Sequence, residues 1–327
     1  MNWAGRRVLV TGAGGFIGSH LTERLIELGA DVRALVHYNA LGTWGWLDQA
    51  PLRNHTQVIT GDICDRDSLS HAMQGREIVF HLAALIAIPY SYHAPSSYLR
   101  INVEGTLNVL QTARDAGVEC IILTSTSEVY GTAQYVPIDE KHPLQGQSPY
   151  SASKIGADKM AEAFHCSFGL PVVTVRPFNT YGPRQSARAV IPTIIVQLLA
   201  GQFIRLGNLY PTRDLNFVAN TVDGFVLAAS IPAAIGRTIN LGSGREVSIG
   251  DLAQLIAKLM DKPIEILCET ERVRPDGSEV ERLLANNSLA RTLLGWEPKV
   301  GLEEGLRRTI EWVEQHAEKY RRGVYVI

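Results

Sequence analysis

The sequence of 327 residues predicts an α/β protein with a doubly wound parallel sheet and a smaller C-terminal α/β part. Three observations lead to this fold class. Short apolar, β-branched segments alternate with helical patterns through the first half of the chain. Three glycines stand at the junction of the first such segment and the first helical pattern. Beyond residue 180 the alternation becomes irregular, and proline, arginine and glycine gather in loops.

The first half of the chain supplies the predicted sheet. In the helical pattern of residues 16–28, Ile17, Leu21 and Leu25 recur at a spacing of four and share one face, and Gly29 fits the C-terminal stop. Strands separated by helices imply a parallel sheet covered on both faces, and right-handed crossovers make a Rossmann-type strand order the economical topology. The predicted strands are 7–11, 31–36, 57–60, 78–82, 120–124 and 171–176, and the helices are 16–28, 68–74, 102–116 and 150–168.

The second half predicts a smaller, loop-rich part that is suited to cover a ligand held over the sheet. Its helical patterns are separated by stretches rich in proline, arginine and glycine. The predicted helices are 191–200, 221–230, 249–260, 288–294 and 302–321, and the loops are 179–188, 207–214 and 272–278.

Charge and composition exclude several classes of protein. Lys plus Arg is 31 and Asp plus Glu is 33, so the formal net charge is −2, a poor basis for non-specific nucleic-acid binding. The sequence has no run of about 18 apolar residues and no recognisable signal peptide. We therefore expect a cytoplasmic protein with no membrane or nucleic-acid partner. The cysteines lack metal-binding spacing, so no metal site is expected, and we interpret them as free, buried thiols: Cys64, Cys120, Cys166 and Cys268.

A glycine-rich turn lies between the first strand and the first helix. Gly12, Gly15 and Gly18 follow the spacing GxxGxxG, and Phe16 and Ile17 open the helix. Glycine is needed here for the tight turn, for close approach of the backbone to a pyrophosphate and for close helix–strand packing. The helix N-terminus adds unpaired N–H groups and a positive dipole end. Because the triplet has this strand–turn–helix context, these residues predict a dinucleotide-binding site.

The TGxxGxxG form of this turn resembles the short-chain dehydrogenase/reductase superfamily. The resemblance implies further cofactor contacts after the third, fourth and fifth strands. His81, at the end of the fourth strand, is either part of such a segment or a buried strand-end histidine. The residues implied in cofactor binding are Asp62 and Ile63, then Leu82, Ala83 and Ala84, and Thr124.

The sequence leaves open whether the cofactor is NAD or NADP. An acidic residue at the end of the second strand would hydrogen-bond the ribose 2′-hydroxyl and favour NAD. Residues 34–39 contain no acid, whereas Arg33 and His37 are compatible with a 2′-phosphate.

Tyr150 and Lys154 form a predicted proton-transfer pair that also contacts the cofactor. Their spacing of four places both side chains on one face of a helix. A free tyrosine has a pKa near 10 and is a poor base at neutral pH. A neighbouring ammonium favours the phenolate, so we expect Lys154 to lower the pKa of Tyr150 toward the working range.

The fifth strand runs into Thr126, Ser127 and Glu128. The family resemblance implies that Thr126 hydrogen-bonds an alcohol oxygen of the substrate. A carboxylate at Glu128 is not needed for simple hydride transfer, but it is needed if a carbon acid must be deprotonated. Once C4 of a hexose is oxidised to a ketone, the C5 proton becomes acidic and a carboxylate can take it. Water then leaves C6, and the hydride returns to C6.

Over almost its whole length the chain resembles extended short-chain dehydrogenases that act on nucleotide sugars. The matching segments are 176–184, 190–192, 213–218 and 274–280. The resemblance implies that Asn179 contacts the substrate diphosphate and that Val190 belongs to the nucleotide-base loop. It also implies that guanidinium groups converge on the diphosphate, a chemistry to which arginine is suited. These are Arg184, Arg213 and Arg274.

The same resemblance implies an NAD(P)-binding domain of residues 1–180, which also receives segments from 215–245, and a nucleotide-sugar-binding domain of residues 181–327. It further implies a homodimer formed through the helices 102–116 and 150–168.

Within this group, the Thr-Ser-Glu triplet is similar to that of 4,6-dehydratases. Through residues 39–47, 211–217 and 274–283 the chain is most similar to bacterial N-acetylglucosamine-nucleotide 4,6-dehydratases of legionaminic-type nonulosonic acid pathways. The dTDP-glucose 4,6-dehydratases carry Asp-Glu where this chain has Ser127-Glu128, and their Asp protonates the leaving C6 hydroxyl. Since Ser127 cannot serve as that acid, we predict that Glu128 both accepts the C5 proton and delivers a proton to the C6 oxygen. NAD or NADP would stay tightly bound and be regenerated in each turnover.

Three other functions compete with a UDP- or GDP-hexose dehydratase. A UDP-hexuronate decarboxylase would use the same oxidation and is favoured by a basic residue near C6. A nucleotide-sugar 4-epimerase needs no carboxylate beside Thr126, so Glu128 disfavours it. A dinucleotide-sensing regulator would be expected to lose Tyr150 or Lys154, and both are present.

Overall fold

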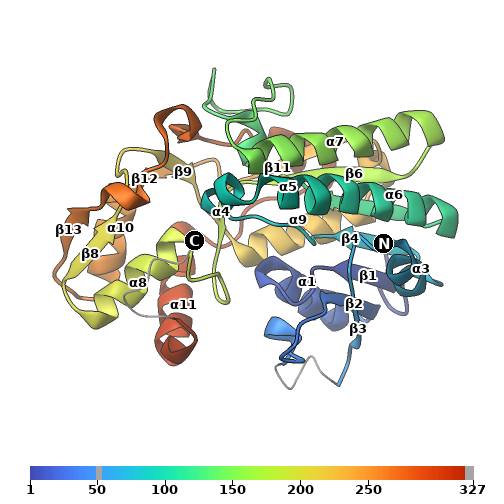
Figure 1. Ribbon diagram of the computed structural model, residues 1–327, viewed down its shortest axis with the longest axis horizontal. Coiled ribbons are helices and arrows are strands. Elements are labelled where there is room, and N and C mark those ends of the chain that lie inside the picture. Colours follow the sequence, from blue (N-terminus) through green and yellow to red (C-terminus); the bar gives the residue numbers. More distant parts are fainter. Residues whose placement is uncertain (49–53, 321–327) are drawn as a thin grey trace.

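The computed structural model describes residues 1–48 and 54–320, and its centre is a seven-stranded parallel sheet (Figure 1). The strand order β11-β6-β5-β4-β1-β2-β3 is that of a doubly wound Rossmann-type sheet, so the predicted fold class is confirmed. The strands are β1 (Arg7–Thr11), β2 (Asp31–His37), β3 (Gln57–Gly61), β4 (Ile78–His81), β5 (Cys120–Thr124), β6 (Val172–Pro177) and β11 (Thr238–Leu241).

The residues of β1 show why the sheet is covered on both faces. Val8 and Val10 pack into one apolar core, and Leu9 between them packs into the other. Successive side chains of a strand point to opposite faces, so a continuous apolar strand requires helices on each side. The first face carries α1 (Phe16–Glu27) and α9 (Val218–Ser230), and the second carries α3 (Arg66–Met73), α6 (Gly105–Ala116) and α7 (Pro149–Phe168).

The order of the strands reverses at β1, which lies between β2 and β4. At such a switch point the connections leave in opposite directions and open a crevice beyond the carboxyl ends of the strands. The glycine-rich turn after β1 and the segments after β4 and β5 therefore reach the same edge of the sheet.

The second half of the chain adds small sheets and helices beyond this edge, on the left in Figure 1. It also returns β11 to the edge of the large sheet, where it pairs with β6. Its helices are α8 (Val190–Ala200), α10 (Ile249–Leu259) and α11 (Leu302–Gln315). Its strands are β7 (Thr180–Tyr181), β8 (Phe203–Leu206), β9 (Thr212–Asp214), β10 (Asn216–Phe217), β12 (Glu246–Ser248), β13 (Glu265–Cys268) and β14 (Arg282–Leu283).

The structure corrects several element boundaries. The helix predicted from residue 102 is preceded by a π-helical turn at Leu99–Glu104. The last predicted helix ends at Gln315 and a short turn follows at Ala317–Lys319, while Arg321 lies outside the described residues. Two short helices, α4 (Ile88–His93) and α5 (Pro95–Tyr98), were not predicted, because each starts at or beside a proline and is too short for a period.

The four cysteines are free thiols, but the expectation that all are buried is wrong. Cys120 is buried and Cys64 is half-buried, whereas Cys166 and Cys268 are exposed. Within residues 1–48 and 54–320, no helix is long and apolar enough to cross a membrane, and no cluster of acidic, histidine or cysteine side chains is suited to a metal ion.

Candidate active site

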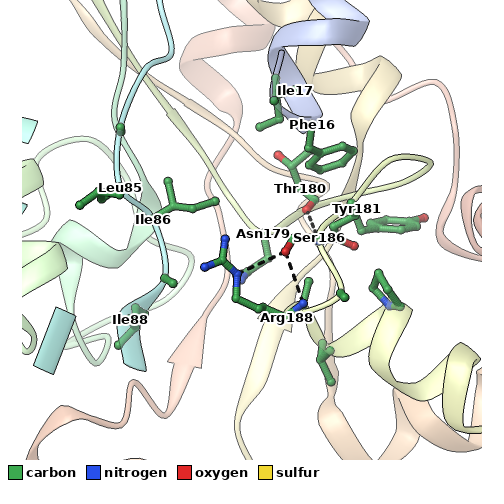
Figure 2. A pocket seen from close by; sticks show the side chains of 18 of the residues that line it. Phe16, Ile17, Leu85, Ile86, Ile88, Asn179, Thr180, Tyr181, Ser186 and Arg188 are labelled. Atoms are coloured by element: carbon green, nitrogen blue, oxygen red, sulfur yellow. Dashed lines mark hydrogen bonds between the residues drawn. The ribbon is translucent and has the colours of Figure 1, made fainter. Parts of the chain in front are cut away.

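One cavity of about 1380 Å³ runs from the carboxyl edge of the large sheet into the C-terminal part (Figure 2). It is larger than the usual pocket for one small ligand, so it has room for a dinucleotide and a second nucleotide. All but one of the residues that the sequence assigned to the site line it. They are Gly12, Gly15, Phe16, Ile17, Asp62, Ile63, Leu82, Ala83, Ala84, Thr124, Thr126, Ser127, Glu128, Tyr150, Lys154, Asn179, Val190, Arg213 and Arg274.

The glycine-rich turn forms a cradle that only glycine permits. Gly12 has a φ of +69°, and a Cβ atom there would lie 2.7 Å from the backbone N of Ala83. Gly15 precedes α1, and no side chain caps the helix, so its first N–H groups remain available. The Oγ1 atom of Thr124 is buried without a hydrogen-bond partner. Bare backbone at a helix N-terminus fits the pyrophosphate of a dinucleotide.

Arg33, whose chemistry is compatible with a 2′-phosphate, does not line the cavity. Its Nη1 atom donates to the carbonyl oxygens of Ala72 at 2.9 Å and Gln74 at 3.0 Å, and its Nε atom donates to Gln57 Oε1 at 2.9 Å. These bonds hold the guanidinium against the end of α3. His37 does line the cavity.

Tyr150 and Lys154 lie in the first turns of α7, where Ser148 and Ser151 form a reciprocal capping box. Both side chains are buried. Lys154 Nζ donates to the carbonyl oxygen of Thr124 at 2.5 Å. Burial lowers the pKa of Lys154 to about 8, and the negative charge of Asp158 opposes this shift.

The pKa of Tyr150 differs from the expectation. Burial raises it above its usual range, a hydrogen bond with Thr126 opposes the shift, and the charge of Glu128 adds to it. The Lys154 ammonium donates its hydrogen bond to the Thr124 carbonyl oxygen. Burial therefore favours the neutral phenol, whereas a nearby positive charge would favour the phenolate.

The Thr126, Ser127 and Glu128 triplet forms a tight turn directly after β5. Thr126 caps this turn, since its Oγ1 atom accepts a hydrogen bond from the backbone N of Glu128 at 3.2 Å. All three residues are buried and line the cavity. The negative charge of Glu128 raises the pKa of both Tyr150 and Arg213. For Tyr150 this adds to the effect of burial, and for Arg213 it opposes it. The carboxylate is thus close enough to interact electrostatically with both a tyrosine and an arginine of the cavity.

A buried polar network behind this site was missed by the sequence reasoning. Asp158 Oδ2 accepts hydrogen bonds from Ser125 Oγ at 2.8 Å and from Arg176 Nε and Nη2 at 3.0 and 2.9 Å. Arg176 Nη1 also donates to Tyr130 Oη at 3.0 Å. The spacing of four between Lys154 and Asp158 was the signal that could have identified it.

His81 proves to be a buried histidine that ties β1 to α6. Its Nδ1 atom is 2.8 Å from Thr11 Oγ1 and its Nε2 atom is 3.1 Å from Thr106 Oγ1. Burial lowers the pKa of His81 to about 3, so the ring is neutral. The end of β4, just before the cavity, is thereby held in place by a histidine that stays neutral.

The three arginines assigned to the diphosphate do not all reach the cavity. Arg213 Nη2 lies 3.2 Å and Arg274 Nη1 lies 3.6 Å from Glu279 Oε1, so two of them meet at one carboxylate in the cavity wall. Arg184 instead pairs with Glu23 on α1, at 2.7 and 3.0 Å. The expectation for Arg184 is corrected, because the left-handed backbone there, with φ of 68°, turns the side chain toward α1.

The fold and the cavity are typical of a dinucleotide-dependent enzyme, and comparisons with known proteins agree. The family model described as GDP-mannose 4,6 dehydratase matches residues 9–309. A UDP-glucose 4-epimerase of Mycolicibacterium smegmatis is 34% identical over 95% of this chain and 100% of its own length. A dTDP-glucose 4,6-dehydratase of Streptomyces griseus is 34% identical over 94% of both chains.

Solved structures show the same likeness. A dTDP-glucose 4,6-dehydratase of Streptomyces venezuelae with NAD bound has a TM-score of 0.88 and 29% identity, covering 96% of this chain and 99% of that one. The chain belongs to the extended short-chain dehydrogenase/reductase family of nucleotide-sugar epimerases and dehydratases.

Proposed function

We propose that the protein is a nucleotide-sugar 4,6-dehydratase, which converts a UDP- or GDP-hexose to the 4-keto-6-deoxy sugar. The observation that carries this proposal is the buried carboxylate of Glu128, which lines the cavity beside Thr126 and acts electrostatically on Tyr150. Oxidation at C4 alone does not need a carboxylate, whereas removal of a proton from C5 does. The sequence resemblance favours N-acetylglucosamine as the sugar.

The residues have distinct roles in this reaction. Thr126 hydrogen-bonds the C4 oxygen, and Tyr150 accepts the proton of that hydroxyl. Glu128 removes the proton from C5 and delivers a proton to the C6 oxygen, which leaves as water. Because Ser127 is no acid, one carboxylate performs both transfers, and C5 then takes a proton that originates from solvent. Lys154, bonded to the Thr124 carbonyl, holds a positive charge at the foot of α7.

We propose NAD as the cofactor, tightly bound and regenerated in each turnover. The glycine cradle fits its pyrophosphate, a related structure holds NAD, and Arg33 is occupied elsewhere. When bound, NAD accepts the hydride from C4 and returns it to C6. Phe16 and Ile17 at the start of α1, Asp62 and Ile63 after β3, and Leu82, Ala83 and Ala84 after β4 would surround it.

The test is to incubate the protein with UDP- and GDP-hexoses without added cofactor and to follow the product by mass spectrometry. Loss of one water supports the dehydratase. In the same assay in D₂O, Glu128→Gln should keep its bound NAD but lose both dehydration and deuterium incorporation at C5. Glu271→Gln, a matched change at an exposed carboxylate, should behave as the wild type. Unchanged dehydration by Glu128→Gln would refute the role of this carboxylate.

A 4-epimerase is the second candidate, because the Mycolicibacterium smegmatis relative carries that name at 34% identity. It would give a product of unchanged mass with an inverted C4 centre. Loss of carbon dioxide from a UDP-hexuronate would instead identify a decarboxylase. Mass therefore separates loss of water from loss of carbon dioxide, and the NMR spectrum of the product at C4 identifies an epimerase.

We also propose that two copies associate through α6 and α7. These helices pack side by side on one flank of the sheet. Leu99, just before α6, is 63% exposed, and Phe168, at the end of α7, is 54% exposed. A second copy would cover such apolar side chains.

A further inference from the structure

Arg188 is a cation of the cavity to which neither the sequence motifs nor the family resemblance gave a role. It lies in the loop between β7 and α8 and lines the cavity. Its Nε atom donates to Ser186 Oγ at 3.3 Å, and its backbone N donates to the same oxygen at 3.4 Å. These hydrogen bonds to Ser186 orient the Arg188 side chain but do not neutralise its positive charge.

In the part of the chain that the structure describes, the other four arginines that line the cavity form two pairs, and the two arginines of each pair share one carboxylate. Arg205 and Arg272 pair with Glu269, and Arg213 and Arg274 both lie at Glu279. Among residues 1–48 and 54–320, no carboxylate lies within ion-pair distance of Arg188. This guanidinium is therefore available for an anionic ligand.

Arg188 differs from the other arginines expected near a bound diphosphate in that no carboxylate of the described residues offsets its charge. A diphosphate in a nucleotide sugar carries two ionised phosphate groups. Arg213 and Arg274 contribute two positive charges, but Glu279 between them cancels one. Arg184, the third arginine expected there, is paired with Glu23 on α1. Arg188 adds a positive charge that no carboxylate among the described residues offsets.

Arg188 lies near Asn179, on the side of the cavity toward Tyr150. Figure 2 shows its guanidinium between Ile86 on one wall and Asn179 on the other. The buried Oδ1 atom of Asn179 has no hydrogen-bond partner, so a polar group is required here. The charge of Arg188 also opposes the burial that raises the pKa of Tyr98 to about 12, and the Tyr98 ring contacts that of Tyr150 at 6.2 Å. Arg188 therefore lies toward the catalytic end.

We infer that Arg188 binds the phosphate group that is joined to the sugar, in the role that the sequence assigned to Arg184. The inference rests on the proposed function only in that the substrate is a nucleoside diphosphate sugar. The two arginines are four residues apart in one loop, and the left-handed backbone at Arg184 sends one to α1 while the other faces the cavity. Ile86, 59% exposed, is an apolar residue on the facing wall of the cavity.

The experiment compares the binding of nucleoside diphosphates and monophosphates by calorimetry, using the protein with its cofactor. UDP and GDP are the probes, and UMP and GMP lack only the phosphate in question. Arg188→Gln should weaken the diphosphate by about 10- to 100-fold and leave the monophosphate unchanged, because hydrogen bonds to charged groups are the strong ones. Arg188→Lys should recover part of the lost diphosphate affinity, since lysine keeps the positive charge but lacks the paired N–H donors of the guanidinium group.

Arg205→Gln is the matched control, because Arg205 lines the cavity but pairs with Glu269 at 2.9 Å. It should leave the ratio of diphosphate to monophosphate affinity unchanged. An unchanged ratio in Arg188→Gln overturns the inference. It is also overturned if UDP-glucuronate alone is weakened while UDP and UDP-glucose are not, or if the wild type binds neither UDP nor GDP. Because no turnover is needed, a 4-epimerase outcome would refute the dehydratase and leave the inference on Arg188 standing.

Discussion

Replacing Asp158 with Asn tests how strongly the network behind the active site holds the fold. Asp158 and Arg176 are joined at 2.9 Å, with side chains that are only 4% and 6% exposed. The amide has the same shape as the carboxylate but no charge, so the guanidinium of Arg176 would stay buried without a counter-ion. The desolvation of an unpaired ion in the interior costs several kcal/mol.

The expected loss is about 3–5 kcal/mol in the free energy of unfolding, the range for breaking one partner of a buried pair. Lys159 and Glu162 on the same helix form an ion pair at 2.6 Å whose side chains are 61% and 60% exposed. Glu162→Gln is therefore the matched control, and it should cost less than about 1 kcal/mol. Both carboxylates become amides on α7, so only burial distinguishes the two changes.

The assay is urea unfolding followed by circular dichroism, for the single variants and for the double variant with Arg176→Met. Removing both charges also removes the unpaired ion, so the double variant should be less destabilised than the sum of the single variants. If Asp158→Asn costs no more than Glu162→Gln, or if the double variant is strictly additive, the reasoning from burial is refuted.

Three further predictions concern the pair of catalytic residues, the cofactor cradle and the dimer. Burial lowers the pKa of Lys154 to about 8 in the folded protein, against 10.5 in the unfolded chain, so the stability of the wild type relative to Lys154→Met should rise as the pH increases between these values. Urea unfolding at several pH values measures this difference in stability. A difference that does not change with pH would contradict the burial argument. Gly12→Ala should weaken NAD binding by about tenfold or more, since the added Cβ would clash with the backbone of Ala83. Gly5→Ala is the control, because Gly5 also has a positive φ, +74°, but open space around it, and it should leave NAD binding unchanged. Calorimetry with NAD compares the two variants. Light scattering after size exclusion should give twice the mass of one chain, and Leu99→Glu should give a single chain if the proposed contact is correct.

Local spacing accounts for what the sequence predicted well. The glycine triplet, the capped start of α7 and the spacing between Tyr150 and Lys154 depend on a few neighbouring residues, so their positions follow from backbone geometry. The carboxyl ends of parallel strands meet at one edge, which explains why Thr126 and Asn179, on different strand ends, line the same cavity. The short helices α4 and α5 and the added strand β11 have too few residues to carry a period.

The pKa of Tyr150 could not be obtained from spacing. The sequence places Lys154 on the same face, but burial outweighs charge here, and the ammonium is bound to the Thr124 carbonyl. The extent of burial depends on α4 and α5, whose side chains Ile88 and Tyr98 pack against Tyr150.

By itself, the sequence determined the fold class and predicted the dinucleotide turn and the candidate catalytic side chains, because each depends on residues close together along the chain. Only the tertiary structure decided which guanidinium groups face the cavity. Arg184 is paired with Glu23, 161 residues away, and Arg188 is left for the ligand. Whether an arginine can bind a ligand depends on whether a carboxylate distant in the sequence packs beside it. Local sequence patterns do not predict such a contact.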